Sequence, residues 1–589
     1  MSRRPCEARF TPTATPKDGP IVAATASHRS ELAALRARPG AKVLIVGGGI
    51  NGVATFRYLA MQGVDVALVE HGDYCQGASG ASSHMIHGGI RYLENGEFRL
   101  VHESVQERNR LLEIAPHYVK PLRTTIPIFS TFSGILSAPM RFLTHRSSTA
   151  TERGAVLIKA GLVLYDVFAG AVGRNTPWHK FRGAKASLAQ LPLLRGDVKY
   201  TATYFDASVH NPERLTLDVL RDGLEANPHV RASNYVSLAG FGVDGARLRD
   251  ELTGEEFDFD ADVLVNATGA WVDLTNEAIG VPSHFMGGTK GSHIVLDHRG
   301  LLEACGGREI FFEHSDGRIV LIYPLGDRVL VGTTDIDADM DVPARCTDAE
   351  AAYFFDLVRH VFPSIEVREE DIVYRFSGVR PLPRHDDTAP GFVSRDYRIE
   401  RTQLPGDTAM LSLVGGKWTT FRALGETLGK KVLAELGVAP GPTTRNLPIG
   451  GGRNYPGTPA ALEAWFAARS ALAGRRRLEM LLERYGTRAD TVLEFIGPDD
   501  PTLPASDELS AAELAYLGTH EHLGSLADVF IRRTSLAFRG LVTQELLEQV
   551  AEALAPVLGW DQGQAAAQVA ECRRVLTEDH GARPALSNA

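Results

Sequence analysis

The chain alternates between short apolar runs and polar or glycine-rich turns, and its first long regular pattern begins at residue 42. The apolar run Val43–Val46 leads into the glycines of Gly47–Gly52, a helical pattern follows, and a second apolar run occupies Val66–Val69. Short apolar runs bounded by glycine predict buried strands. A strand, a helix and a second strand in this order predict two parallel strands of one sheet.

The glycine turn joins the first predicted strand to the helix, and each glycine has its own expected task. Gly47 permits the tight turn, Gly49 lets the backbone approach a pyrophosphate, and Gly52 lets the helix pack on the strand. The free N–H groups of the helix N-terminus would bind that pyrophosphate. Glu70 ends the second strand, where a carboxylate can hold the ribose hydroxyls of an adenosine. Together these features predict a bound dinucleotide.

Two later segments repeat the pattern of a strand followed by a small-residue turn. Val263–Asn266 runs into Ala267-Thr268-Gly269, and Ala409–Val414 runs into Gly415-Gly416-Lys417. Strands that return to the same sheet would place these turns beside the same cofactor. An NAD enzyme usually needs only the first turn, whereas a flavin is larger and stays bound. The pattern therefore favours FAD over NAD.

The rest of the chain predicts two further parts. Arg318–Pro324 and Arg328–Asp335 have the pattern of antiparallel strands of a second sheet, and the chain becomes helical almost throughout after Gly450. We expect a flexible extension at residues 1–40, with a short helix near Glu31–Arg38, an oxidoreductase region at 41–445 and a helical C-terminal domain at 446–589. Within the oxidoreductase region we expect the FAD-binding and substrate-binding domains to be interleaved.

Composition narrows the functional class. A chain of 589 residues is long enough for two or three domains, and its formal net charge of −10 argues against a nucleic-acid partner. Its five cysteines are scattered without a C-x-x-C pair, which excludes a disulfide framework and a recognisable zinc site and fits a reducing, cytoplasmic compartment. We expect no metal.

Four cations stand out along the chain. They are Arg91 beside Tyr92, Arg380, Arg395 and Lys417. If these segments meet beside a flavin, the pocket suits a small anionic substrate, either a phosphate or a carboxylate, because arginine forms bidentate contacts with such oxygens. A single loop arginine is more often a solvated surface residue, so the inference depends on the segments coming together.

These segments resemble the aerobic, FAD-dependent glycerol-3-phosphate dehydrogenases, in the order of that family. The tail segment Glu513–Arg533 resembles the family's helical C-terminal domain. The matching stretches of the catalytic part are Ile45–Gly52, Ser82–Glu94, Val265–Gly269, Lys290–Ile294, Gly332–Asp335, Ser377–Leu382 and Gly415–Thr420.

The resemblance implies a Rossmann-like FAD-binding domain of the glutathione-reductase or D-amino-acid-oxidase type, within an α/β (α+β) chain that also carries an antiparallel-sheet substrate domain and an α-helical C-terminal domain. It implies oxidation of sn-glycerol 3-phosphate to dihydroxyacetone phosphate. Electrons would pass from FAD to a quinone or another respiratory-chain acceptor. It also implies a peripheral contact with the membrane and is compatible with a homodimer.

The resemblance also assigns roles to individual residues. Arg91, Tyr92, Arg395 and Lys417 are expected to bind substrate, with Arg380 and His293 nearest the carbon that is oxidised. His293 is the candidate base, because the unperturbed pKa of histidine lies near working pH, although a lone histidine is more often structural. The expected cofactor-binding residues are Gly47, Gly49, Asn51, Gly52, Glu70, Ser79, Ser82, Ser83, His87, Gly88, Val236, Thr268, Gly269, Asp335, Gly416 and Thr419.

Two alternative functions stay open at this point, and one segment can be interpreted in two ways. The enzyme could be a glycerol-3-phosphate oxidase that reduces O₂, and the motifs barely separate the two activities. The protein could also be a non-catalytic FAD-binding subunit. The segment Ile126–Leu143 is apolar but interrupted by proline and glycine, which fits an interfacial membrane segment and a buried loop equally well.

Overall fold

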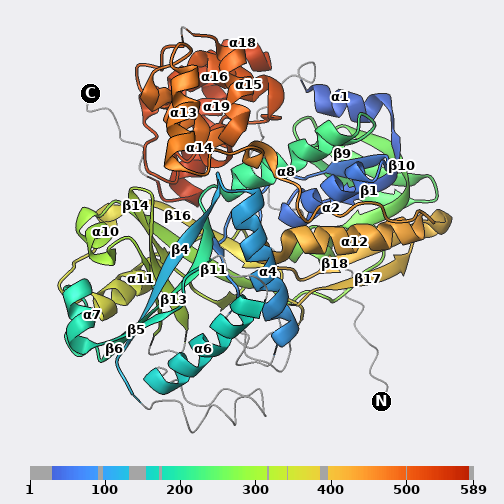
Figure 1. Ribbon diagram of the computed structural model, residues 1–589. Coiled ribbons are helices and arrows are strands. Elements are labelled where there is room, and N and C mark those ends of the chain that lie inside the picture. Colours follow the sequence, from blue (N-terminus) through green and yellow to red (C-terminus); the bar gives the residue numbers. More distant parts are fainter. Residues whose placement is uncertain are drawn as a thin grey trace, which may run out of the picture.

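The computed structural model describes residues 29–89, 97–131, 154–171, 176–314, 318–340, 342–384, 396–498 and 500–582. Figure 1 shows a parallel sheet, an antiparallel sheet and a helical C-terminal part that adjoin one another. Within these residues no helix is both long enough and apolar enough to cross a membrane.

The first sheet is built around β1 (Gly40–Val46), which has parallel neighbours on both sides, β10 (Glu256–Asn266) and β2 (Val66–Val69). Its strand order is β17-β18-β10-β1-β2-β7, and only β17 at one edge of this series runs antiparallel to its neighbour. The hairpin β8–β9 extends from the beginning of β10. The bounds of these other strands are β7 (Arg231–Ser233), β8 (Val236–Gly242), β9 (Gly245–Asp250), β17 (Arg398–Gln403) and β18 (Ala409–Val414).

Helices and the β8–β9 hairpin cover the two faces of this sheet, which explains why its strands are continuous apolar runs. Val43 and Ile45 of β1 pack in one core with the helices that follow the glycine turns, whereas Leu44 and Val46 pack in another with α1 and the β8–β9 hairpin. The helices concerned are α1 (Ser30–Ala37), α2 (Ile50–Met61), α8 (Pro212–Ala226), α9 (Val272–Ala278) and α12 (Phe421–Glu435).

Helix α1 is the short helix that the sequence predicts near Glu31–Arg38. Its Leu32 and Leu35 are buried, and the guanidinium of Arg29 donates to Asp250 over 2.6 Å. The described part of the expected extension, residues 29–40, is therefore packed through this helix and Arg29. Residues 1–28 lie outside the described residues.

The second sheet has the order β15-β11-β14-β13-β12-β4-β6-β3, with β16 added to β11 and β5 added to β6. All its described pairings are antiparallel except β12 with β4, so the predicted strands β13 and β14 are confirmed. The bounds are β3 (Met85–Ile86), β4 (Val119–Ile128), β5 (Lys180–Gly183), β6 (Tyr200–Val209), β11 (Thr289–Leu296), β12 (Glu309–Glu313), β13 (Ile319–Leu325), β14 (Arg328–Gly332), β15 (Ile336–Asp337) and β16 (Ile372–Arg380).

Apart from the C-terminal helices, helices pack on this sheet in two separate cores. One core joins the sheet to α7 (Ala184–Gln190), α10 (Arg299–Cys305) and α11 (Asp348–Val361). The other joins it to α4 (Phe98–Ile114) and α6 (Ala155–Ala171), which lie beside the lower strands in Figure 1.

The C-terminal part is helical, as the sequence predicts, and its helices share a large apolar core with strands of the second sheet. Several of its helices begin at a polar cap: the side chains of Thr458, Ser510, Thr543 and Asp561 each accept a backbone N–H of the first turn. The bounds are α13 (Pro459–Arg469), α14 (Arg475–Tyr485), α15 (Ala489–Ile496), α16 (Ala511–His520), α17 (Leu526–Asp528), the π-helix η8 (Val529–Arg533), α18 (Gln544–Leu558), α19 (Gln562–Arg574) and the π-helix η9 (Val575–Asp579).

Candidate active site

The glycine turn between β1 and α2 leaves no room for side chains. Gly47 has a φ of +113°, and a Cβ added there would lie 2.6 Å from the carbonyl oxygen of Ala267. A Cβ on Gly52 would lie 1.9 Å from the carbonyl oxygen of Gly47. Both positions therefore require glycine, and the N-terminus of α2 is held close to the ends of β1 and β10.

Polar side chains surround this helix N-terminus. Glu70, at the end of β2, accepts hydrogen bonds from the N–H groups of Gly48 (2.6 Å) and Gly72 (3.0 Å), and the hydroxyl of Ser79 accepts the N–H of Ile50 (3.0 Å). Burial raises the pKa of Glu70 above its usual value, although the two backbone N–H groups act against the shift. A carboxylate oxygen has more than one acceptor site, so Glu70 can still bind a ribose hydroxyl.

The other predicted cofactor residues of this sheet lie along the same edge. The N–H of Val236 donates to the carbonyl oxygen of Glu70 (2.7 Å), and the hydroxyl of Thr268 donates to Asn266 (2.7 Å). Gly269 has a φ of +66°, and a Cβ there would meet no atom within 4 Å. The edge therefore combines close-packed glycines with one that faces open space.

Asn51 and Gly416 meet at this edge. Oδ1 of Asn51 is buried and has no hydrogen-bond partner among the described residues. A Cβ on Gly416 would lie 2.7 Å from Nδ2 of the same side chain. An unpartnered buried acceptor beside two glycine turns fits a bound dinucleotide, because a buried polar atom normally has a partner.

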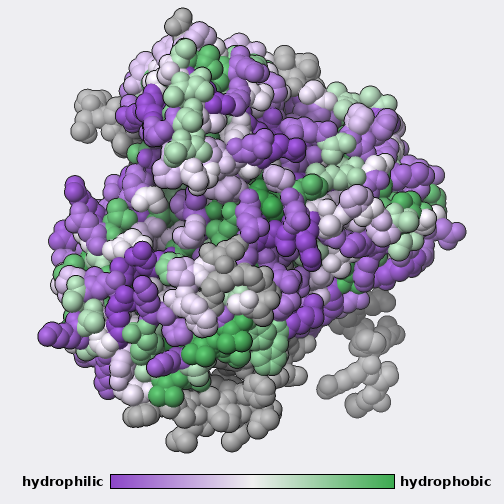
Figure 2. Space-filling model, viewed as in Figure 1, coloured by the Kyte–Doolittle hydropathy of each residue, from purple (hydrophilic) through white to green (hydrophobic). Residues whose placement is uncertain are grey.

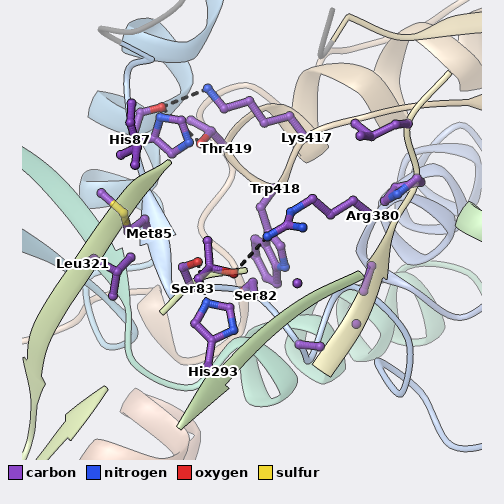
Figure 3. A pocket seen from close by; sticks show the side chains of 18 of the residues that line it. Ser82, Ser83, Met85, His87, His293, Leu321, Arg380, Lys417, Trp418 and Thr419 are labelled. Carbon is purple, nitrogen blue, oxygen red and sulfur yellow. Dashed lines mark hydrogen bonds between the residues drawn. The ribbon is translucent and has the colours of Figure 1, made fainter. Parts of the chain in front are cut away.

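A cavity of about 320 Å³ lies between this edge and the antiparallel sheet (Figure 3). Its wall combines the loop that follows β2 with β11, β16 and the turn that follows β18. The lining residues include Ala78, Ser82, Ser83, Met85, His87, Asp206, Gly291, His293, Leu321, Thr333, Gly378, Arg380, Gly416, Lys417, Trp418 and Thr419.

His293, on β11, lies at the cavity wall and is held on two sides. Nε2 is 2.8 Å from the hydroxyl of Ser83, and the ring stacks on Phe376 with 4.8 Å between centroids. Nδ1 is buried without a hydrogen-bond partner within the described part of the chain. Burial, together with Arg380 and His84, lowers the pKa of His293 well below its ordinary value. The pKa of His293 therefore departs from the unperturbed value for which His293 is the candidate base, and this direction favours the neutral imidazole.

Arg380 ends β16, and its guanidinium is fixed by the segment that follows β14. It donates to Asp335 (3.1 Å), to the hydroxyl of Thr333 (2.9 Å) and to the carbonyl oxygen of Thr334 (2.9 Å). A Cβ on Gly291 would lie 2.0 Å from Nη2 of Arg380. Because Gly291 has no side chain, the guanidinium of Arg380 has room to lie against it. Asp335, predicted as a cofactor residue, serves here as the ion-pair partner of Arg380.

Lys417 lies in the turn after β18, and its ammonium points toward His87 (Figure 3). Its ammonium donates to the carbonyl oxygen of His87 (3.1 Å) and to Ser104 (3.0 Å), and the hydroxyl of Thr419 donates to the same carbonyl (3.2 Å). The next residue, Gly88, donates its N–H to Asp206 over 2.9 Å. The turn after β18 therefore fixes the segment that leads toward residue 90.

Three of the predicted substrate ligands, Arg91, Tyr92 and Arg395, lie outside the described residues. The structure brings together Ser82, Ser83, His87, His293, Arg380, Lys417 and Thr419 around the cavity. The predictions missed Thr333, Asp206 and Trp418. Thr333 and Trp418 both lie inside recognised segments, and the indole of Trp418 donates to the carbonyl oxygen of Ser79 (2.9 Å). Asp206 lies on β6, where nothing in the surrounding sequence marks it.

The parallel sheet with its glycine turn, and the cation-lined cavity beside it, define a dinucleotide-dependent oxidoreductase. Among the described residues no group of three or more His, Cys, Asp or Glu side chains could hold a metal ion. The family model for FAD-dependent oxidoreductases matches residues 42–429, and the model for the C-terminal domain of alpha-glycerophosphate oxidase matches residues 442–565.

Curated relatives agree with this class, and a solved structure has a similar fold. A glycerol-3-phosphate dehydrogenase of a Synechocystis species is 30% identical over 91% of this chain and 96% of the relative, and one of Pseudomonas aeruginosa is 32% identical over 84% and 91%. The structure of the Bacillus halodurans glycerol-3-phosphate dehydrogenase, complexed with FAD, is similar in fold, with a TM-score of 0.68, 21% identity and coverage of 95% and 98%. The chain belongs to the family of aerobic, FAD-dependent glycerol-3-phosphate dehydrogenases, and its cofactor is FAD.

Proposed function

We propose that the protein oxidises sn-glycerol 3-phosphate to dihydroxyacetone phosphate and passes the electrons to a quinone. The observation that carries the proposal is the cavity whose wall holds a neutral histidine, His293, together with two cations, Arg380 and Lys417. The cations can bind a phosphate and stabilise a developing alkoxide, and the histidine can accept the hydroxyl proton of a secondary alcohol. The names of the curated relatives support the same substrate.

The chain's own residues would share the work as follows. FAD, when bound at the edge of the parallel sheet, accepts a hydride. Nε2 of His293 takes the hydroxyl proton of the substrate, directly or through the Ser83 hydroxyl that lies 2.8 Å away. Arg380, held by Asp335, stabilises the negative charge that grows on the substrate oxygen. A phosphate dianion in the cavity would raise the pKa of His293, because an opposite charge favours the imidazolium.

The phosphate end of the substrate would be held by Lys417 together with Arg91, Tyr92 and Arg395. Removing one charged partner of a phosphate typically costs about 2–5 kcal/mol. We expect Arg395→Ala to lower kcat/KM for glycerol 3-phosphate far more than for glycerol, which has no phosphate to lose. Equal losses on the two substrates would count against this assignment.

The test of the proposed reaction is anaerobic addition of glycerol 3-phosphate to the FAD-loaded protein while flavin absorbance is recorded. Rapid bleaching is expected with glycerol 3-phosphate and only slow bleaching with glycerol. A flavoprotein that no small phosphorylated alcohol bleaches would instead be a non-catalytic FAD-binding subunit.

One observation favours a second candidate, an oxidase. The C-terminal residues match the model for the C-terminal domain of alpha-glycerophosphate oxidase. The relatives named dehydrogenases favour an acceptor other than O₂. Purified protein should therefore reduce a soluble quinone rapidly while it consumes little oxygen. Stoichiometric peroxide formation at a similar rate would establish the oxidase.

Peripheral membrane contact is part of the proposal, and α6 supports it. Apolar side chains gather over α6 in Figure 2, and Val156, Val163, Leu164 and Val167 on this helix are 39–56% exposed. An apolar helix face at the surface commonly marks a site of protein or membrane contact.

The segment that suggested membrane contact from the sequence behaves differently. Its first residues, Ile126–Ile128, belong to β4, and the guanidinium of Arg195 lies 3.8 Å from the ring centroid of Phe129. This end of the segment is packed, and residues 132–143 lie outside the described part. Vesicle flotation of a Val163→Ser, Val167→Ser variant tests the α6 proposal: weaker binding is expected than for Val243→Ser, a matched change at a 79% exposed turn residue. Equal binding of both variants would refute it.

A further inference from the structure

The C-terminal helices contact the loop that follows β2, and the contact is centred on Asp73. This side chain is fully buried three residues after Glu70, on the same loop that supplies Ser79 and Ser83. Its Oδ2 accepts from Nε of Arg532 (2.5 Å) and Nη1 of Arg533 (2.7 Å), and its Oδ1 accepts from Nη2 of Arg533 (2.9 Å). Two arginines of one helix turn thus bind a single carboxylate.

Residues near Asp73 make further contacts with the C-terminal part. The hydroxyl of Tyr74 lies 3.1 Å from Nδ1 of His522, and the side-chain amide of Asn234 donates both to Asp73 and to the carbonyl oxygen of His522, over 2.8 Å each. Tyr235 donates its hydroxyl to Asp528 over 2.7 Å. Both chain segments beside Glu70 are therefore anchored to the C-terminal part.

Arg532 and Arg533 are themselves held in place by other residues of the C-terminal part. Arg532 also donates to Asp528 (2.6 Å), and Arg533 donates to the carbonyl oxygen of Glu521 from Nη2 (2.7 Å). Both lie in the π-helix η8, whose wider turn is often found at functional sites. Burial alone would raise the pKa of Asp73, but Arg533 and Arg532 outweigh it, and the pKa lies below its usual range. Asp73 is thus a fixed negative charge that both arginines need.

The anchored loop reaches both ends of the proposed cofactor site. Its beginning carries Glu70, whose carboxylate bonds the glycine turn at Gly48. Its middle carries Ser79, whose hydroxyl bonds the first turn of α2. Its end carries Ser83, which bonds His293. A displacement of Asp73 would therefore move the adenosine end of the site first.

We propose that Asp73, Arg532 and Arg533 are positioning residues through which the C-terminal domain holds the FAD-binding loop in its binding conformation. The inference rests on the proposed placement of FAD at Glu70 and α2. It gives the C-terminal helices a task in cofactor retention, which the fold alone does not assign to them.

The experiment measures the FAD dissociation constant of the full-length apoprotein by flavin fluorescence, together with the melting temperature of the apoprotein. Asp73→Asn and Arg533→Gln are compared with Arg488→Gln. Arg488 forms a similar, largely buried ion pair from the C-terminal part to Asp222 of α8 (2.8 Å), and none of its described contacts reaches residues 70–83. All three variants should melt at lower temperature.

Only the first two variants should bind FAD more weakly, by about 10-fold or more, which corresponds to about 1.4 kcal/mol. Arg532→Lys keeps the charge but cannot reproduce the arginine geometry, so it serves if the other two variants do not fold, with an expected loss of several-fold. FAD affinities of the Asp73, Arg533 and Arg532 variants within twofold of that of Arg488→Gln would overturn the inference. Failure of the wild-type protein to bind FAD would instead refute the proposed function.

Discussion

The hydroxyl of Ser83 lies 2.8 Å from Nε2 of His293, and this contact joins the cofactor loop of one sheet to strand β11 of the other. The two residues are 210 positions apart in the chain. The loop belongs to the part that would hold FAD, and β11 belongs to the wall that would hold the substrate. Under the proposed function, the contact lies where the substrate would lose a hydride from its carbon and a proton from the hydroxyl group on that carbon.

The first prediction concerns the pH dependence that follows from this environment. Since the pKa of His293 lies well below 6.5, the imidazole is already deprotonated at neutral pH, and the acid limb of kcat/KM should fall below pH 6.5. His293→Gln should lower kcat by roughly 10²- to 10⁴-fold and remove that limb. A variant whose pH–rate profile matches wild type would exclude His293 as the base. Ser83→Ala, which removes only the Nε2 partner, should shift the limb and keep most of the rate.

The second prediction concerns the space that Gly291 leaves for Arg380. A methyl group at this position would overlap the guanidinium, so Gly291→Ala should displace Arg380 and lower kcat/KM by about 100-fold or more, as a misplaced catalytic group typically does. The bound flavin should remain. Gly240→Ala is the control, because its Cβ would meet only the Cβ of Arg247 at 4.0 Å. Steady-state kinetics with equal flavin content would contradict the prediction if both variants kept full activity.

The third prediction concerns the glycine turn itself. Gly52→Ala places a methyl group 1.9 Å from the carbonyl oxygen of Gly47, so it should abolish FAD retention and destabilise the protein by about 1–3 kcal/mol or more. Gly161→Ala in α6 meets no atom within 4 Å and should instead stabilise the fold by up to about 1 kcal/mol. Flavin content and thermal melting measure both effects, and a yellow, stable Gly52→Ala protein would contradict the first.

The fourth prediction uses Glu309, a fully buried acid on β12 that accepts a hydrogen bond from Thr124 over 2.6 Å. Burial raises the pKa of Glu309 to about 8. The folded state therefore keeps a proton that the unfolded state loses above pH 4.5, so stability falls as pH rises from about 4.5 to 8.

Glu309→Gln should remove this loss and raise the free energy of unfolding at pH 8 by roughly 2–4 kcal/mol relative to its effect at pH 4.5. Chemical denaturation at the two pH values is the measurement. Glu303→Gln, at a 66% exposed site, should show little pH-dependent difference. An effect of Glu309→Gln on the free energy of unfolding that is the same at both pH values would contradict the raised pKa of Glu309.

The sequence was sufficient for features that are local in the chain. The spacing of apolar residues and glycines within one segment predicts each of them: the βαβ unit, the strands β13 and β14 and the C-terminal helices. The pKa of His293 could not be predicted in this way, because it depends on burial and on Arg380, which reaches the site from another strand. Asp206 is missed for the same reason, since its partners Arg108, Tyr165 and Gly88 come from separate elements.

The segment beginning at Ile126 is one for which the sequence fits an interfacial membrane segment and a buried loop equally well. Its apolar composition was compatible with membrane contact, yet Phe129 packs against Arg195 and lies edge-on to His360, both of which are distant in sequence. Composition reports how much apolar surface a segment has. It does not report which partner covers that surface.

The strand order of the first sheet has a consequence for synthesis on the ribosome. β1 is among the first strands to emerge, but its neighbour β10 ends at Asn266, and β18, which borders β10, ends only at Val414. The sheet can close only when more than two thirds of the chain has been made. Until then the emerging polypeptide exposes apolar strand edges, a state that favours aggregation and needs protection by chaperones. Translation speed beyond residue 266 should therefore influence the yield of native protein.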